Sequence, residues 1–278
     1  MKAEKVIKNI GSDLASLVKV ALMSKFIGRV RVERGSSSIV IMGNGPSLRK
    51  TIDEDPDLLA DSDLMAVNFA GNTPDFRLLA PRYYILADGH FFNGITSDEN
   101  VRALWDSFKN ISWKMTLFVP VKYKHLVKVL LMDAPNVKTE FFNLTPIEGS
   151  IGLSHLLFDL GLGMPRPRNV MVPAIICAIR MGYEQIIICG ADHTWTKTLD
   201  VTEDNIVVSV QPHFYQDNEK EEKRVKETYR NIRLHEVLGS MAVAFKSYCE
   251  IAQYAKKKGI DIINATPGSM IDAFPRKK

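Results

Sequence analysis

Residues 39–48 read Ile39-Val-Ile-Met-Gly-Asn-Gly-Pro-Ser-Leu48, and this stretch decides the fold that the sequence predicts. Four consecutive apolar residues are typical of a short strand buried on both faces, as in the middle of a parallel sheet. The two glycines that follow permit a tight turn and a close approach of the backbone to a ligand. A helix can open at the next residues, and its free N–H groups suit phosphate oxygens. The turn is neither a Walker A loop nor a GxGxxG fingerprint, so a purely structural turn is the alternative. We favour ligand binding by Gly43, Asn44, Gly45, Pro46 and Ser47.

Further apolar runs follow the same pattern along the chain. They predict strands at 64–67, 83–87, 115–119, 186–189 and 260–263, and helical patterns separate them at 100–108, 123–132, 170–181 and 237–258. Strands that alternate with helices indicate βαβ units. The expected fold class is therefore α/β: a Rossmann-like open, mostly parallel sheet with helices on both faces. We expect one domain over residues 35–278.

Two segments stand outside this alternation. Residues 5–32 carry apolar residues at helical spacing with lysines and arginines among them, which predicts a basic amphipathic helix within an N-terminal unit of residues 1–34. This helix either lies on an anionic membrane or packs on the domain, and the sequence leaves both readings open. Residues 194–233 have many charges and few core positions, so we expect an excursion, part loop and part helix, that acts as a lid.

Composition narrows the class of protein. Of 278 residues, 46% are apolar and 24% charged, which is ordinary for a globular protein, and the net charge of +4 is too mild for a nucleic-acid groove. No apolar stretch is long enough to span a membrane, and the first residues show no secretory signal pattern. The three cysteines lack metal-ligand spacing and indicate a reducing compartment. The expected location is the cytoplasm, with peripheral contact at the inner face of the membrane as an option.

Polar residues follow several predicted strands directly. Because the carboxyl ends of parallel strands share one edge of a sheet, these residues are expected to form one polar crevice there: Asn44, Asn68, Asp88 and Asp192. Each alone could be a turn or cap residue. The two aspartates could also hold Mg²⁺ beside phosphates, but the pattern requires no metal.

A late strand runs into a Thr-Pro-Gly-Ser turn at the same edge. If a helix opens there, its N–H groups at Thr266, Gly268 and Ser269 could bind a second part of a nucleotide, and a plain turn is the alternative. Four histidines remain as candidates for a general base, since a neutral imidazole suits deprotonation of a hydroxyl. They are His90 and His193 after strand ends, His213 in the lid and His235 near the start of the last long helix.

Three blocks carry a resemblance to a known family: residues 41–49, residues 178–192 and residues 263–269. In these blocks the sequence resembles the bacterial sialyltransferases of glycosyltransferase family 42 and the related 6-hydroxymethylpterin pyrophosphokinase-like superfamily. The resemblance implies that the loop at 43–47 binds the CMP part of a donor, with Asn68, Asp88 and Asn169 nearby. The carboxylate of Asp88, in place of an amide, leaves the donor sugar open. In that family the catalytic base is a histidine that follows a lid, and His213 and His235 both fit this position. We favour His213 because Phe214 and Tyr215 could supply aromatic contacts to the donor.

The leading functional prediction is therefore a metal-independent, inverting glycosyltransferase with a nucleotide-activated sugar donor, CMP-linked if the sialyltransferase resemblance holds. Its acceptor would be a surface polysaccharide or a lipid-linked glycan. Its catalytic residues would be His213, His235 and Asp192. No further cofactor is required. One alternative is a Mg²⁺-dependent diphosphotransferase acting on a pterin-like hydroxymethyl group. Another is a non-catalytic nucleotide-binding partner in a polysaccharide assembly complex. Nucleic acid is not an expected partner, and a homo-oligomer stays open.

Overall fold

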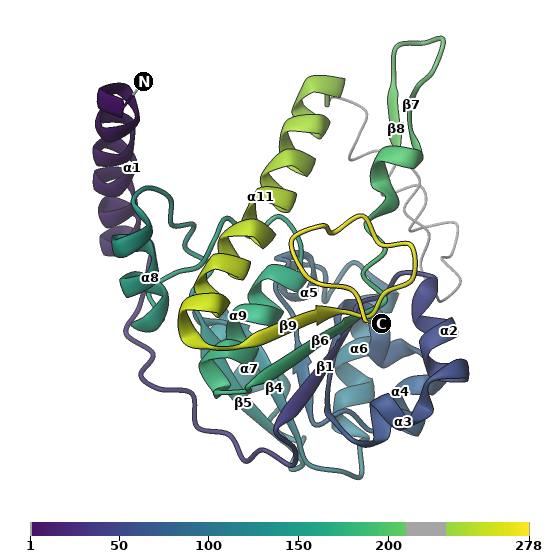
Figure 1. Ribbon diagram of the computed structural model, residues 1–278. Helices are drawn as coiled ribbons and strands as arrows, with labels where there is room; N and C mark the ends of the chain where they lie inside the picture. The colour runs from purple at the N-terminus through teal and green to yellow at the C-terminus, as the bar shows by residue number, and fades with distance from the viewer. Residues whose placement is uncertain (1, 210–231, 278) are drawn as a thin grey trace.

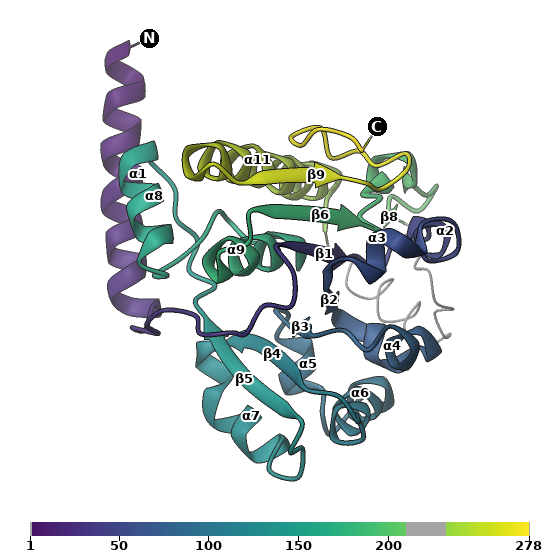
Figure 2. The same cartoon turned by 60° about the horizontal axis from the view of Figure 1, so that its bottom comes forward.

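The computed structural model describes residues 2–209 and 232–277. Seven strands form one parallel sheet in the order β5-β4-β3-β2-β1-β6-β9 (Figure 1; all seven are labelled in Figure 2). The strands are β1 (Ser38–Met42), β2 (Asp63–Val67), β3 (Tyr83–Ile85), β4 (Met115–Pro120), β5 (Val137–Phe142), β6 (Gln185–Cys189) and β9 (Asp261–Asn264). All six neighbouring pairs run parallel. The predicted α/β class and parallel sheet are confirmed.

Strand β1 shows why the quoted run of apolar residues forms the centre of the sheet. Ile39 and Ile41 belong to the core on one face of the sheet, whereas Val40 and Met42 belong to the core on the other. All four side chains are at most 4% exposed. Because both faces are covered by helices, the strand carries no polar alternation.

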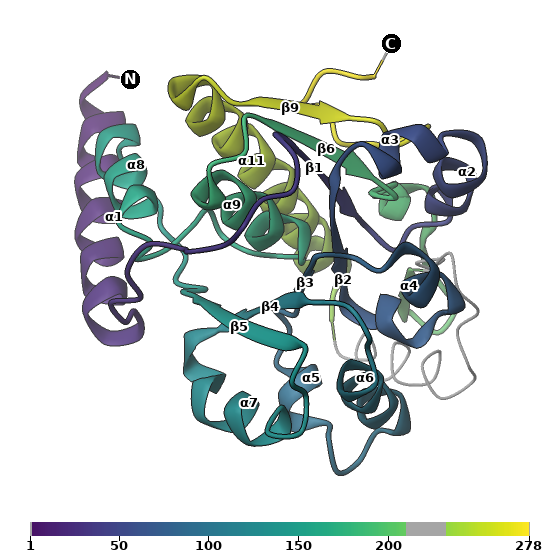
Figure 3. The ribbon, with the colours of Figure 1, turned by 90° about the horizontal axis from the view of Figure 1, so that it is seen from below.

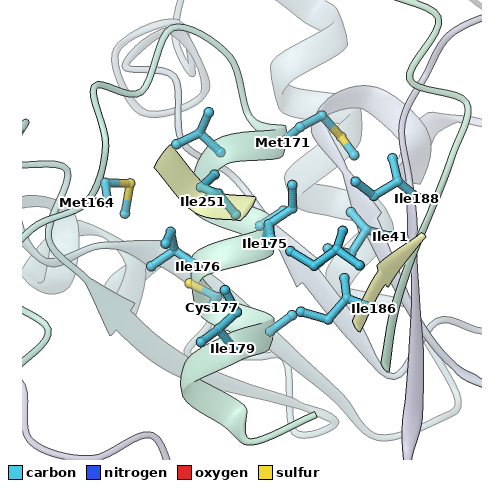
Figure 4. Close-up of a cluster of buried hydrophobic side chains, with 14 of the residues drawn as sticks. Ile41, Met164, Met171, Ile175, Ile176, Cys177, Ile179, Ile186, Ile188 and Ile251 are labelled. Atoms are coloured by element: carbon cyan, nitrogen blue, oxygen red, sulfur yellow. The ribbon is translucent and has the colours of Figure 1, made fainter. Parts of the chain in front are cut away.

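Helices cover both faces of the sheet, as predicted (Figures 2 and 3). The first face packs against α8 (Ile151–Asp159), α9 (Met171–Met181) and α11 (Leu234–Lys258). The second packs against α2 (Ser47–Glu54), α3 (Pro56–Ala60), α4 (Pro74–Leu79), α5 (His90–Asn93), α6 (Glu99–Lys109) and α7 (Lys124–Leu130). Helix α9 is buried along almost its whole length, and Figure 4 shows Ile175 among the isoleucines of β1, β6 and α11. Short 3₁₀ turns occupy Asn68–Asn72, Val121–Tyr123 and Thr194–Lys197.

The N-terminal helix α1 (Lys2–Met23) is present but ends nine residues before the predicted boundary at residue 32. Just past its end, the Ser24 hydroxyl donates to the Leu162 carbonyl at 2.5 Å and the Lys25 N–H donates to Asn143 Oδ1 at 2.9 Å. Gly28 then has φ +71°, a left-handed conformation that a right-handed helix cannot contain. Contacts with residues that follow β5 and α8 therefore end the helix. No described helix is long and apolar enough to cross the hydrocarbon core of a bilayer.

Two further features differ from the sequence prediction. Edge strand β5 was not predicted, because only its last residue, Phe142, is fully buried and the strand lacks an apolar run. The described part of the excursion contains an antiparallel hairpin of β7 (Leu199–Val201) and β8 (Val207–Ser209), where loop and helix were expected. Residues 210–231 of the predicted lid lie outside the described residues.

Candidate functional site

A cavity of about 320 Å³ lies at the carboxyl ends of the central strands. Asn44 follows β1, Asn68 follows β2, Asp88 follows β3 and Asp192 follows β6, and all four line this one cavity. Strand β1 has β2 on one side and β6 on the other, so the cavity sits where the strand order reverses. Doubly wound sheets bind ligands at this point. The predicted convergence of the four residues is therefore observed.

Two glycine turns shape the floor of the cavity. The N–H of Gly43 donates to the Cys189 carbonyl and the N–H of Gly45 donates to the Gly190 carbonyl, both at 2.8 Å, which continues the pairing beyond the strands. A Cβ on Gly43 would lie 2.5 Å from the Gly190 oxygen, and one on Gly190 would lie 2.3 Å from the Gly43 oxygen. Only glycine permits this contact, and the contact fixes the backbone that presents Asn44.

Two amide side chains in the cavity each have a buried oxygen without a hydrogen-bond partner. Asn44 is 9% exposed; its Nδ2 donates to the Val67 carbonyl at 3.2 Å, while its Oδ1 has no partner among the described residues. Asn68 adopts φ +51°, a left-handed conformation that asparagine tolerates, and its Oδ1 is likewise unpartnered. A buried acceptor without a partner costs free energy, which a ligand or water in the cavity would recover.

Asn169, just before α9, supplies a hydrogen-bond donor to the cavity, in contrast to the acceptors of Asn44 and Asn68. Its Oδ1 accepts from the Tyr248 hydroxyl at 2.9 Å and from the Met171 N–H at 3.0 Å. These two donors assign the oxygen, so the amide NH₂ is the group that has no partner in the described ranges, and Asn169 lines the cavity. The cavity therefore combines two unpartnered acceptors with one unpartnered donor.

His193 supports this arrangement from behind. Its Nε2 lies 2.6 Å from the Tyr248 hydroxyl, whose proton goes to Asn169, so Nε2 carries the hydrogen. Its ring stacks on Trp195 at a centroid distance of 4.2 Å, and both residues line the cavity. Burial lowers the pKa of His193 to about 3. Such a weakly basic imidazole stays neutral at pH 7 and is poorly matched to general-base work.

Charge in the cavity is sparse. Asp192 accepts from the Ser47 hydroxyl at 2.7 Å, and Asp88 accepts from the His90 N–H at 2.8 Å. The start of α2 therefore already faces a carboxylate, so a phosphate placed there would meet Asp192. The exposed Arg168 is the cation in the cavity lining, and it makes no ion pair within the described part of the chain.

The Thr-Pro-Gly-Ser turn lies outside the cavity lining. The Thr266 hydroxyl accepts from the Ala191 N–H at 3.1 Å, and the Ser269 hydroxyl donates to the Ala191 carbonyl at 2.7 Å. Both side chains are buried, and no helix opens at Gly268. Of the two alternatives that the sequence left open, the structure shows the plain turn. The turn instead holds the backbone just before Asp192, because the N–H and the C=O of Ala191 are both hydrogen-bonded to it.

The candidate bases and the aromatic contact stand apart from this cavity. His235 lies exposed in the first turn of α11 and is not among the cavity-lining residues. His213, Phe214 and Tyr215 lie outside the described residues. His90 pairs with Asp98 at 2.8 Å. Within residues 2–209 and 232–277, no group of three or more His, Cys, Asp or Glu side chains is placed to hold a metal ion.

Sequence reasoning did not single out three residues of the site. Arg168 and Trp195 line the cavity, and Tyr248 orients Asn169 from the middle of α11. Trp195 offered a signal, since it follows the Asp192-His193 pair within three residues. The sequence gives no such signal for Tyr248, because a tyrosine at core spacing in a helix is ordinarily explained by packing alone.

No protein-family model matches the sequence, and no curated protein matches it. Among solved structures, the fold is similar to one described as the MAf glycosyltransferase from Magnetospirillum magneticum AMB-1, with a TM-score of 0.49 and 10% sequence identity. The superposition covers 96% of this chain and 38% of that chain. This chain therefore spans well under half the length of the protein that it matches.

Proposed function

We propose that the protein is a glycosyltransferase that binds a nucleotide-activated sugar in this cavity. The observation that carries the proposal is the set of unpartnered amide atoms, Asn44 Oδ1, Asn68 Oδ1 and Asn169 Nδ2, around a cavity at the switch point of the sheet. Acceptors and donors held in a fixed orientation suit sugar hydroxyls and the edge of a nucleobase. The resemblance of residues 41–49 and 178–192 to sialyltransferases supports the same class of substrate.

Charge favours a donor with a single phosphate. Among residues 2–209 and 232–277, the cavity lining carries two carboxylates, Asp88 and Asp192, against one cation, Arg168. A nucleoside triphosphate would bring several negative charges toward these carboxylates, which costs free energy without a bound metal ion. A CMP-linked sugar brings one phosphodiester, which Arg168 can pair, while the carboxylates can accept hydrogen bonds from hydroxyl groups.

Asp88 and Asp192 also favour a second candidate, the Mg²⁺-dependent diphosphotransferase. Both carboxylates line the cavity, and each accepts one hydrogen bond from the described part of the protein, which leaves lone pairs for an ion. In that function the two aspartates would hold Mg²⁺, and the ion would neutralise phosphate charge. The third candidate, a binding partner without catalysis, needs the same cavity but no base.

In the transferase, a histidine would take the proton of the acceptor hydroxyl as the sugar transfers with inversion. We propose His213 for this role, with His235 as the other candidate, because the pKa of the cavity residue His193 is too low for an effective base. His213→Ala should abolish transfer and leave donor binding unchanged, whereas His235→Ala serves as the matched comparison. Full activity of the His213→Ala variant would exclude that residue.

Ligand-induced thermal stabilisation with CMP, UDP, GDP and ATP, each with and without Mg²⁺, separates the three functions. A ligand at a hundredfold excess over its Kd adds about 2.7 kcal/mol to the free energy of unfolding. We expect the largest shift with CMP and no dependence on Mg²⁺. A shift with ATP that requires Mg²⁺ would favour the diphosphotransferase. Binding of CMP-sugars with no transfer to any glycan acceptor would favour the assembly partner.

Asn169→Asp tests the site itself. Its carboxylate can still accept from Tyr248 and Met171, but an oxygen replaces the donor NH₂ that faces the cavity. We expect at least a tenfold weaker affinity for CMP, since a site built around a donor rejects a ligand once that donor becomes an acceptor. Unchanged affinity would show that the ligand does not occupy this cavity.

A further inference from the structure

Helix α1 is amphipathic in the opposite sense to an ordinary surface helix. Between residues 9 and 23, every residue of α1 that is exposed is apolar or glycine. The polar residues of the same stretch are all at least partly buried, and they are Asn9, Ser12, Asp13, Ser16 and Lys19. A helix that serves only to cover a domain would turn its apolar side inward.

Specific contacts hold α1 in this orientation. The Ser16 hydroxyl donates to the Glu148 carbonyl at 2.7 Å and accepts from the Glu148 N–H at 2.9 Å. Asp13 Oδ1 accepts from the Ser150 N–H at 2.7 Å, and Lys19 Nζ lies 3.5 Å from a Glu148 carboxylate oxygen. The polar side of α1 is therefore fixed to the segment before α8, and Figures 1 and 2 show the two helices side by side at one edge of the molecule.

The outward side carries large apolar residues that the domain leaves uncovered. We call this side the outer face of α1, and its residues are Ile10, Leu14, Leu17, Val18 and Leu22, which are 45–78% exposed. Phe26, just past the helix, is 86% exposed. An apolar face of this kind marks a contact site for a membrane or a protein partner.

Charge decides between an anionic membrane and a second copy of this chain. Residues 1–34 contain eight Lys and Arg against three acidic residues, a net charge of +5, while the whole chain carries +4. Residues 35–278 therefore carry −1, and all of the excess positive charge belongs to the segment that includes α1. Two copies joined through α1 would bring +5 against +5, whereas anionic headgroups attract these cations.

We propose that the outer face of α1 docks the protein on the surface of an anionic membrane. The helix would lie in the interface, with its apolar side toward the acyl chains and its polar side held by the protein. Exposed Lys25 and Arg29 follow directly after the helix, where they can reach headgroups. This inference is independent of the proposed function, because it concerns a surface apart from the cavity.

Vesicle flotation tests the docking with the full chain. We expect the wild-type protein to float with vesicles of phosphatidylcholine and phosphatidylglycerol and to stay behind with phosphatidylcholine alone. Leu14→Ser with Val18→Ser should lower the partition coefficient at least tenfold, because both side chains are exposed and their loss costs no core packing. Lys25→Gln with Arg29→Gln should lower it about fivefold per charge removed.

The matched control replaces two apolar residues outside α1 that are more exposed than Leu14 and Val18, Leu78→Ser with Met132→Ser, at 77% and 75% against 60% and 57%. This control should float like the wild type. Sedimentation velocity of the same variants checks for self-association. The proposal is overturned if the wild type does not float, if the α1 variant floats equally well, or if α1 variants instead abolish a dimer that ignores vesicles. Nucleotide-induced stabilisation should be unchanged in the α1 variant, so failure here stays separate from failure of the proposed function.

Discussion

The Tyr248 hydroxyl donates a 2.9 Å hydrogen bond to Asn169 Oδ1 across 79 residues of sequence, and this contact fixes which end of the amide faces the cavity. The Met171 N–H donates to the same oxygen at 3.0 Å, so the two donors together keep the nitrogen of the amide toward the cavity. The same hydroxyl accepts from His193, so one tyrosine in α11 connects two cavity-lining residues.

Tyr248→Phe should therefore weaken nucleotide binding while the cavity keeps its shape. We expect roughly a tenfold rise in the Kd for CMP, equivalent to about 1.4 kcal/mol, because Asn169 loses one of its two orienting donors and keeps only the Met171 N–H. Isothermal titration calorimetry measures this change. The matched control is Tyr254→Phe, which removes a hydroxyl that donates to Asp159 at 2.6 Å and does not touch the cavity lining. Equal losses in both variants would contradict the proposed role of Tyr248.

Acid should destabilise the protein through His193. Burial lowers the pKa of His193 to about 3 in the folded chain, compared with about 6.5 when the chain unfolds. Between these pH values His193 is protonated in the unfolded chain but not in the folded chain. Its contribution to the free energy of unfolding is therefore complete above pH 6.5 and decreases as the pH falls below about 6.5. The expected slope is about 1.4 kcal/mol per pH unit.

Urea unfolding of the wild type and of His193→Asn at pH 5, 6 and 7 isolates this contribution. The variant is expected to be less stable at pH 7 and to lose about 2 kcal/mol less than the wild type between pH 7 and pH 5. Parallel pH dependences of the two proteins would show that His193 titrates normally.

Gly190→Ala should disrupt the floor of the cavity. Gly190 has φ +63°, and its added Cβ would lie 2.3 Å from the Gly43 carbonyl oxygen. Gly259→Ala is the matched control, because Gly259 has φ +69° with nothing within 4 Å of the added atom. We expect a cost of about 1 kcal/mol for the control, from backbone strain alone, and at least about 3 kcal/mol for Gly190→Ala. Chemical denaturation measures both, and similar costs would refute the close contact of the two turns.

The thiols should differ sharply in reactivity. Burial raises the pKa of all three thiols, to about 12 for Cys177 and Cys189, but Cys249 alone among them is exposed to solvent. Because the thiolate is the reactive form, a disulfide reagent at pH 8 should titrate one thiol in the native protein and three after denaturation. Cys249→Ser should remove the native reaction, and rapid reaction of a second thiol would mean that the core opens readily.

The amino-acid sequence alone determined the parallel sheet, the helices on both of its faces and the polar residues at its carboxyl edge. A strand buried on both faces needs a continuous apolar run, so residues 39–42 and the later runs predicted a parallel sheet with helices on both sides, and the structure confirms it. Parallel strands share one carboxyl edge, so the meeting of Asn44, Asn68, Asp88 and Asp192 was also predictable. These features depend on local periodicity and on chain direction, both of which are written in the sequence.

Tertiary packing decided the rest. The polar side of α1 faces inward because Asp13 and Ser16 find partners before α8, more than 130 residues away, and helical spacing cannot reveal which face a helix buries. Thr266 and Ser269 likewise bond a distant partner, the Ala191 backbone, and do not line the cavity. Their positions in the sequence do not reveal that partner. A residue type allows a hydrogen bond, but only the folded chain brings its partner within 3 Å.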